Sequence, residues 1–130
     1  SNIGFGYVQT DKRYVANYKD GAWDKGALTD DPNIVMNECA GVLQYAQTCF
    51  EGLKAYTTED GHIVTFRPDL NAERLMDSAA RLEMPQLPKE QFIDAVDQVV
   101  RLMPDMYHRM DQELPCIFAH ICLVLTLLSV

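Results

Sequence analysis

The stretch that decides the predicted fold is Leu43-Gln44-Tyr45-Ala46-Gln47-Thr48-Cys49-Phe50-Glu51-Gly52-Leu53-Lys54-Ala55-Tyr56. Its first half spaces apolar residues at helical intervals as far as Phe50, which predicts a helix. Gly52 is typical of a helix end, where a positive φ is needed. Leu53 to Tyr56 then alternates with a period of two, which predicts a strand. We therefore expect a passage from helix to strand that keeps Tyr45 and Phe50 close together; on spacing alone both are ordinary core residues.

The composition is that of a globular protein. The chain has 130 residues, enough for one ordinary domain. A hydrophobic share of 48% and a charged share of 23% argue against disorder. The net charge of −8 argues against nucleic-acid partners, because phosphate backbones require a basic face on the protein. A local anion site remains compatible with that charge.

Cysteine spacing and the N-terminus favour a cytoplasmic protein. The four cysteines, Cys39, Cys49, Cys116 and Cys122, form no C-x-x-C pair, so we expect no metal site. A chain of this size with its own core does not need disulfides, which favours free thiols in a reducing compartment. The N-terminus has neither the basic region nor the apolar region of a signal peptide.

Turn signals divide the rest of the chain. Arg13–Tyr18 is a predicted strand that ends at Lys19-Asp20-Gly21, and Trp23 opens a loop, so that together they are expected to form an N-terminal hairpin or meander. Ile34–Met36 is predicted to be a brief strand.

Two further strands and two helices are predicted beyond the central stretch. Leu53–Thr58 and His62–Phe66 flank Asp60-Gly61, which indicates a hairpin of antiparallel strands. Pro68 suits the first turn of a helix whose apolar face runs to Leu82. A second helix begins after Pro88 and ends at Pro104.

The last part of the chain differs in character. Pro115–Val130 is almost continuously apolar but too short for a comfortable membrane span, which needs roughly 20 residues. As a strand it would be buried on both faces. We expect an incomplete unit whose covering partner is missing, and oligomers driven by this apolar area; a membrane anchor is the less favoured alternative.

Three arginines recur every seven residues and are candidates for an anion site. Arg67, Arg74 and Arg81 place two guanidinium groups near one helix face and the third at its entry. They form either a solvated stripe balanced by neighbouring acids or a grip for phosphate, which the planar guanidinium matches bidentately.

Other catalytic signals are weak. Lys54 is a conceivable Schiff-base lysine, but its place in an alternating strand favours a side chain that reaches solvent. His62 is expected to be a solvated residue beside a turn. We find no Ser-His-Asp constellation, no phosphate-cradling glycine loop and no metal-ligand spacing.

Two long motifs carry a family resemblance. The first is the opening stretch, and the second is Phe66-Arg67-Pro68-Asp69-Leu70-Asn71-Ala72-Glu73-Arg74-Leu75, followed by Ser78-Ala79-x-Arg81-Leu82 and Met84-Pro85. With the opening Phe5-Gly6-x-x-x-Thr10-Asp11, they resemble the branched-chain amino acid aminotransferases, which are pyridoxal 5'-phosphate (PLP) enzymes of fold type IV. The resemblance covers roughly residues 5 to 103.

The resemblance implies a fold, a reaction and a site. Residues 1–103 would be the α+β small N-terminal domain, with an antiparallel sheet and packed helices. The family transfers the amino group of leucine, isoleucine or valine to 2-oxoglutarate, and its members form homodimers. Arg74 matches the arginine that holds the PLP phosphate, and Phe5, Tyr45 and Phe50 match aromatic residues that line the substrate pocket.

The departures from the family pattern matter equally. The family's Schiff-base lysine and most PLP contacts belong to a large domain beyond this chain. Residues 104–130 are a divergent apolar tail where the family continues into a strand with Tyr-x-Arg-Pro; a shifted reading frame, a splice form and real divergence all remain open.

Two rival functions follow. The chain is alternatively a non-catalytic form that self-associates or binds a full-length subunit. A related type IV enzyme for D-amino acids or aminodeoxychorismate is disfavoured by the Phe50–Tyr56 string.

Overall fold

The computed structural model describes residues 11–102 and the backbone of residues 118–126. The elements in chain order are β1 (Arg13–Val15), β2 (Tyr18–Lys19), β3 (Ala22–Trp23), β4 (Ala27–Thr29), α1 (Gly41–Tyr45), β5 (Thr48–Thr57), β6 (Ile63–Thr65), α2 (Pro68–Arg81), α3 (Lys89–Val100) and β7 (Phe118–Thr126). This mixture of antiparallel sheets and helices agrees with the predicted α+β class. Phe5 lies outside the described residues.

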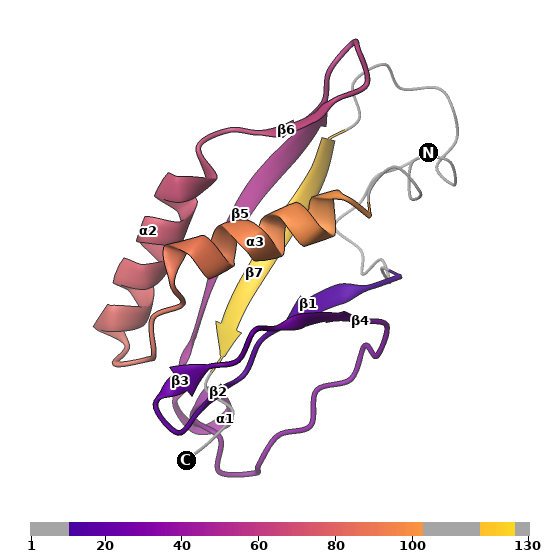
Figure 1. Cartoon of the computed structure of the whole chain (residues 1–130). Coiled ribbons are helices and arrows are strands. Elements are labelled where there is room, and N and C mark those ends of the chain that lie inside the picture. The colour runs from indigo at the N-terminus through magenta and orange to yellow at the C-terminus, as the bar shows by residue number, and fades with distance from the viewer. Residues whose placement is uncertain (1–10, 103–117, 127–130) are drawn as a thin grey trace, which may run out of the picture.

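Strand β5 is the centre of the largest sheet. This sheet has the order β6-β5-β7, and both pairings are antiparallel (Figure 1). The register with β7 runs from Thr48 opposite Thr126 to Tyr56 opposite Phe118. The predicted hairpin around Asp60-Gly61 is confirmed, because β6 pairs with the end of β5 and places Tyr56 opposite Val64. The apolar tail therefore supplies a strand to this sheet.

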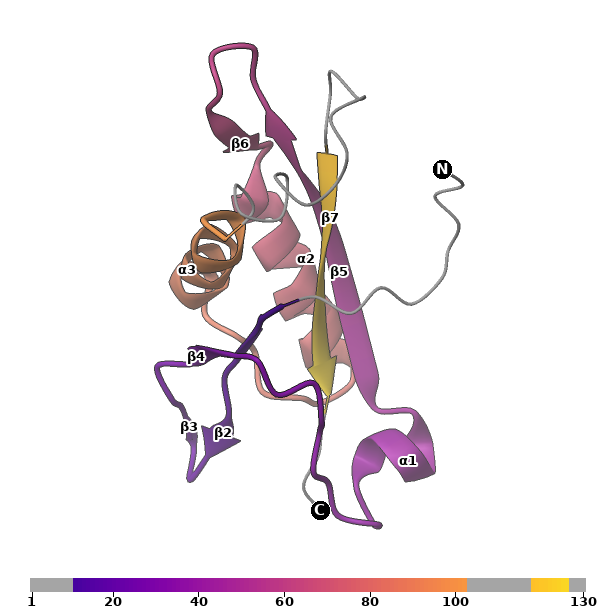
Figure 2. The same ribbon diagram turned by 90° about the vertical axis from the view of Figure 1, so that its right-hand side faces the viewer.

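The helices α2 and α3 lie on one side of this sheet, whereas no described helix covers its other face (Figure 2). Side chains of β5 alternate in burial, with Glu51, Leu53 and Ala55 buried and the residues between them exposed. The buried side chains from β5, α2, α3 and the α2–α3 connection form one core, with Phe92 completely buried. Burial of such a phenylalanine contributes roughly 1.5–3 kcal/mol.

The N-terminal part of the chain is attached to this core by polar contacts. β1 pairs with β4, and β2 pairs with β3 through the turn at Asp20-Gly21. The indole N–H of Trp23 donates to the carbonyl of Gln86, 2.9 Å away, and the side-chain amide of Gln91 donates to the carbonyl of Asp24. These bonds join the hairpins to the α2–α3 connection and to α3.

The predicted helix through Phe50 is wrong in extent. Helix α1 ends at Tyr45, and the residue that adopts the left-handed conformation after it is Ala46, with φ of 50°, rather than Gly52. Cys49 and Phe50 belong to β5, because a five-residue helix buries little apolar surface and pairing with β7 stabilises the extended form. Gly52 lies inside the strand.

Three N-terminal predictions also need correction. The predicted strand Arg13–Tyr18 is two strands separated at Asn17, whose backbone N–H donates to a carboxylate oxygen of Asp24 instead of a ladder partner. Trp23 is in β3, opposite Tyr18, and not in a loop. Ile34–Met36 forms no strand and is exposed, since it has no pairing strand in the described part of the chain.

Both predicted helices are present, but α3 ends at Val100, before the predicted end at Pro104, which lies outside the described residues. Helix α2 begins with Pro68 at its first position, as expected for a residue without an N–H. It ends in two hydrogen bonds, from Met84 N–H to the carbonyl of Ala79 and from Glu83 N–H to the carbonyl of Ala80. This is the Schellman arrangement, and it places Glu83 in the left-handed region with φ of 53°. No described helix has the length and hydropathy of a membrane span.

Replacement of Glu83 by glycine is expected to stabilise the protein by about 1 kcal/mol, because glycine adopts a positive φ without a Cβ penalty. The free energy of unfolding from urea denaturation measures this effect. Glu90→Gly is the matched control, since this exposed residue lies in the first turn of α3 and its replacement should destabilise by roughly 0.5–1 kcal/mol. Equal destabilisation by both variants would contradict the assigned helix end.

Candidate functional site

Glu51 of β5 and Arg74 of α2 form an ion pair between the sheet and a helix. Arg74 Nε lies 3.0 Å from Glu51 Oε2, and Arg74 Nη2 lies 2.5 Å from Glu51 Oε1. The carboxylate therefore meets the guanidinium side-on, through two parallel N–H donors. Glu51 is only 8% exposed, whereas the side chain of Arg74 is 66% exposed. The pair thus joins a buried anion on β5 to a cation at the surface of α2.

Asn71 completes this contact one helical turn before Arg74. Its side-chain amide donates to Glu51 Oε1 at 3.0 Å and to the carbonyl of Gly52 at 3.1 Å. The backbone N–H of Gly52 donates to the same carboxylate oxygen at 3.0 Å. The carboxylate thus accepts hydrogen bonds from Arg74, Asn71 and the backbone, as a buried anion requires.

The topology explains why these polar groups meet here. Strand β6 pairs with β5 only from Ala55 to Thr57, so the edge of β5 is open at Gly52. Figure 1 shows α2 beside β5 on the side away from β7. Asn71 and Glu51 therefore satisfy the backbone groups of Gly52 that a longer β6 would have bonded. We call Glu51, Asn71 and Arg74 the edge cluster.

The charges in the edge cluster stabilise one another. The hydrogen bond from Arg74 has the largest effect and lowers the pKa of Glu51 below its ordinary value of 4.5. Burial acts in the opposite direction, and the bonds from Asn71 and the Gly52 N–H help to lower it. Glu51 in turn raises the pKa of Arg74. Both groups are ionised at neutral pH.

Arg74 retains the donors needed for an oxyanion. Side-on binding to Glu51 uses Nε and one hydrogen of Nη2, which leaves the end-on edge formed by Nη1 and the second Nη2 hydrogen. This edge belongs to a side chain that is 66% exposed. Two parallel donors match two oxygens of a phosphate, so the residues present fit the phosphate group of a cofactor such as PLP.

Of the predicted aromatic residues, Phe50 does not share a face with the ion pair. Phe50 is 74% exposed, and as the neighbour of the buried Glu51 it projects from the opposite face of β5. Tyr45 is 85% exposed at the end of α1. Neither is an ordinary core residue, which corrects the expectation from spacing. The third, Phe5, lies outside the described residues.

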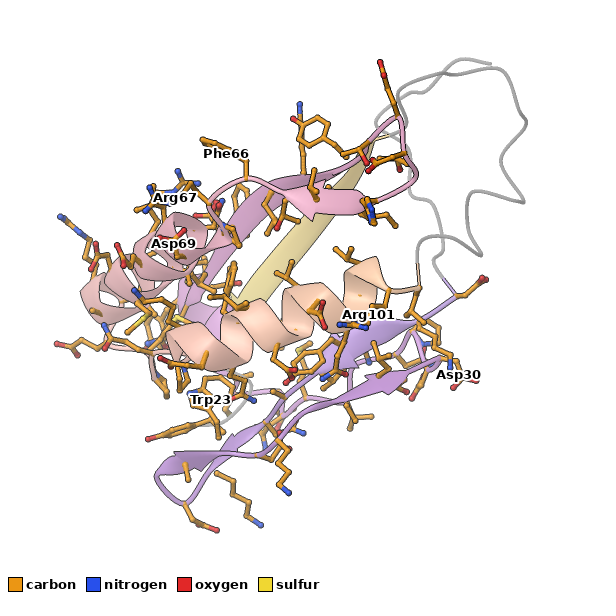
Figure 3. All side chains as sticks on the ribbon, turned by 45° about the horizontal axis from the view of Figure 1, so that its top comes forward. Trp23, Asp30, Phe66, Arg67, Asp69 and Arg101 are labelled. Carbon is orange, nitrogen blue, oxygen red and sulfur yellow. The ribbon has the colours of Figure 1, made fainter. Side chains whose placement is uncertain are left out.

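The outer face of the sheet carries a broader aromatic surface than predicted. Tyr56 and Val64, which are paired across the hairpin, are 44% and 45% exposed, and Phe66 is 82% exposed. Figure 3 shows Phe66 next to Arg67 and Asp69 at the start of α2. Phe50, Tyr56 and Val64 project from the face of the sheet that α2 and α3 do not cover, which we call the outer face, and Phe66 is exposed directly after β6. Lys54 is also exposed on the outer face.

The other arginines and the histidine have structural explanations. Arg67 is the N-cap of α2 with φ of 47°, and its guanidinium holds Asp69, whose pKa it lowers to about 2. Arg81 is exposed in the last turn of α2. His62 is exposed beside the turn, as predicted, with its Nε2 3.4 Å from a carboxylate oxygen of Asp60. The three predicted arginines therefore do not form one grip.

Glu51 and Asn71 were not among the predicted site residues. The signal for Glu51 was its position two residues before Leu53, which places its carboxylate on the buried face once the strand is extended to Thr48. The predicted helix through Phe50 concealed this signal. Among the described residues no group of three or more His, Cys, Asp or Glu side chains could hold a metal ion, and Cys39 and Cys49 are free thiols.

Comparison with known proteins identifies aminotransferases as relatives. The chain is 49% identical over 105 residues to a branched-chain-amino-acid aminotransferase of Haemophilus influenzae, covering 81% of this chain and 31% of the relative. It is 44% identical over 100 residues to such an enzyme of Helicobacter pylori, covering 77% and 29%. A methionine aminotransferase of Arabidopsis thaliana is 46% identical over 98 residues, covering 75% and 28%. No family model matches.

The matched stretch is a limited part of these relatives. The chain spans about three tenths of the length of the relatives it matches. Its identity to the methionine aminotransferase, 46%, lies between the 49% and 44% found for the two branched-chain enzymes, so this segment does not by itself distinguish the two substrate classes.

The ion pair predicts an acid-sensitive contribution to stability. Because the pKa of Glu51 is lowered in the folded protein, its contribution is present above pH 4.5 and is lost as the pH falls through the folded value. Glu51→Gln should therefore cost about 1 kcal/mol near pH 7, a modest value because Arg74 is exposed to solvent. Urea denaturation between about pH 7 and pH 3 should show this difference shrink. A difference independent of pH would contradict the ion pair.

Proposed function

The chain carries a segment of the branched-chain-amino-acid aminotransferase family, and on that premise we propose that it forms the small N-terminal domain of a fold type IV, PLP-dependent transaminase. The complete protein would transfer the amino group of leucine, isoleucine or valine to 2-oxoglutarate. The similarity over about four fifths of the chain carries this proposal. When bound, PLP accepts the amino group and withdraws electrons from the reacting carbon.

Arg74 is proposed to bind the phosphate of PLP. The support is its end-on guanidinium edge, which belongs to an exposed side chain and offers two parallel donors. The side-on edge is taken by Glu51, so the guanidinium is already oriented before a phosphate arrives. Such preorganisation reduces the entropy lost on binding.

Phe5, Tyr45 and Phe50 are proposed to line the substrate pocket. The high exposure of Tyr45 and Phe50 supports this proposal, because it leaves both rings available to contact another part of the protein or the substrate. An apolar wall of this kind selects by shape and buried methyl groups, which contribute about 1–3 kcal/mol of discrimination. A branched aliphatic chain and the side chain of methionine are both compatible with it.

The remaining parts of the catalyst are proposed to lie outside this chain. The Schiff-base lysine and most PLP contacts would belong to a large domain, and the outer face of the sheet would be covered by that domain or by the second subunit of a homodimer. A cytoplasmic protein fits this proposal. Neither Lys54 nor any other residue of this chain is assigned the role of the catalytic lysine.

The alternative function is a non-catalytic form that self-associates or binds a full-length subunit. It is favoured by the departure of residues 104–130 from the family pattern. Its test is the addition of this chain to a full-length subunit, followed by sedimentation. A complex of the two would support it, whereas independent sedimentation would exclude this mode of action.

The genetic code permits a shifted reading frame as the origin of the divergent tail. Across Pro115–His120, the third base of each codon followed by the first two bases of the next can spell Leu-Tyr-Ile-Arg-Pro. This string contains the Tyr-x-Arg-Pro that the resemblance implies at this place. Sequencing of the transcript through this region tests the inference, because the shifted frame must continue into a lysine-bearing domain.

In the complete protein, Arg74→Ala is expected to weaken PLP binding by roughly ten- to a hundredfold, since a bidentate charged contact is lost. Titration of the apo-protein with PLP, followed by visible absorbance, measures the dissociation constant. Arg81→Ala is the control, because Arg81 is an exposed arginine of the same helix. Unchanged PLP affinity in Arg74→Ala would remove Arg74 from the proposed site.

The 130-residue chain alone is expected to show no transaminase activity and no borohydride-stable PLP adduct on a lysine, because the proposed catalytic lysine is outside it. Incubation with PLP, reduction with borohydride and peptide mass spectrometry measure this. Lys54→Ala serves as the comparison, since Lys54 is the lysine of the central stretch. A stoichiometric adduct at one defined lysine would overturn the assignment.

A further inference from the structure

We propose that Glu51, held by Asn71, is a positioning residue that sets the orientation of Arg74 toward the phosphate of the cofactor. The proposal rests on the proposed function, since it assigns Arg74 to a phosphate. It extends that function to a buried acid and an amide to which no phosphate role has been assigned. Neither residue would contact the phosphate itself.

The guanidinium of Arg74 has two edges that can each donate two parallel hydrogen bonds. Glu51 binds Nε and Nη2 with distances of 3.0 and 2.5 Å, and this side-on contact fixes the plane of the guanidinium. The end-on edge must then point away from the carboxylate. Glu51 therefore determines which direction the remaining donors of Arg74 face, although it binds a different edge of the guanidinium from any end-on ligand.

Glu51 is buried and is held in place by hydrogen bonds of its own. A carboxylate that is 8% exposed and accepts bonds from Asn71 and the Gly52 N–H cannot follow a moving arginine. Asn71 is itself fixed by its second bond, to the Gly52 carbonyl at the open edge of β5. The side chain of Arg74 is itself 66% exposed, but these bonds fix its orientation relative to the backbone of β5.

If Glu51 neutralises Arg74 or if it positions Arg74, its removal should change phosphate binding in opposite directions. If the carboxylate merely neutralised Arg74, its removal would leave a net positive charge and strengthen phosphate binding. If it positions Arg74, removal allows the long side chain to sample its other rotamers, and phosphate binding weakens. The sign of the effect therefore distinguishes positioning from neutralisation.

The experiment uses the complete protein with Glu51→Gln, Arg74→Ala and the double variant, and PLP as the probe. The PLP dissociation constant of the apo-protein is measured by titration, and the phosphorus-31 NMR shift of bound PLP reports the surroundings of the phosphate. Glu73→Gln is the matched control, because Glu73 also forms an ion pair from α2, with Lys89. Thermal unfolding of each apo-protein identifies variants that fail to fold.

We expect Glu51→Gln to raise the PLP dissociation constant about three- to tenfold and to change the phosphorus-31 shift, with no further loss when it is added to Arg74→Ala. Glu51→Asp, which keeps the carboxylate, should recover part of the affinity. Tighter PLP binding by Glu51→Gln, or an equal loss with and without Arg74, would overturn the positioning role. An effect of Arg74→Ala without one of Glu51→Gln would overturn this inference alone, whereas no effect of Arg74→Ala would overturn the proposed phosphate site.

Discussion

The structure depends on how one buried carboxylate is satisfied. Strand β5 alternates strictly, and the face that presents Leu53 and Ala55 to the helices also presents Glu51. An unpaired anion in this position would cost several kcal/mol, so α2 must place donors against it. Asn71 and Arg74, one turn apart, do so, and this contact fixes how the helix lies along the open edge of the strand.

The parts of the fold that local chemistry controls could be predicted from the sequence. Pro68 and Pro88 mark the starts of α2 and α3, and Asp60-Gly61 marks the turn before β6. These signals depend on backbone constraints within a few residues. The same is true of the exposed His62, whose position beside a turn predicted its environment.

The parts that depend on distant partners could not be predicted. The stretch before Gly52 has helical spacing, but pairing with β7, more than seventy residues later, makes its second half, from Thr48 onward, a strand. That one misassignment turned Phe50 into an expected core residue and concealed Glu51. Conversely, Ile34–Met36 has the composition of a strand but finds no pairing strand within residues 11–102 and 118–126. In the first segment a distant pairing strand, and in the second the lack of one, outweighed local propensity.

The two faces of β5 differ in burial. The inner face holds the core and the edge cluster, and the outer face presents Phe50, Tyr56 and Val64. A cofactor contact at Arg74 and a substrate contact at Phe50 would therefore be made across the thickness of one strand, at the edge that β6 leaves open. This arrangement is compatible with a site that other parts of a larger protein complete.

Gly52 interrupts the row of side chains on the outer face between Phe50 and Lys54. Within the described residues, a Cβ placed on it would meet no atom within 4 Å, and its φ is not in the left-handed region, so neither crowding nor torsion there calls for a glycine. Any larger residue would form a continuous ridge from Phe50 to Lys54. The hydrogen atom in its place leaves the main chain uncovered between Phe50 and Lys54 on this face.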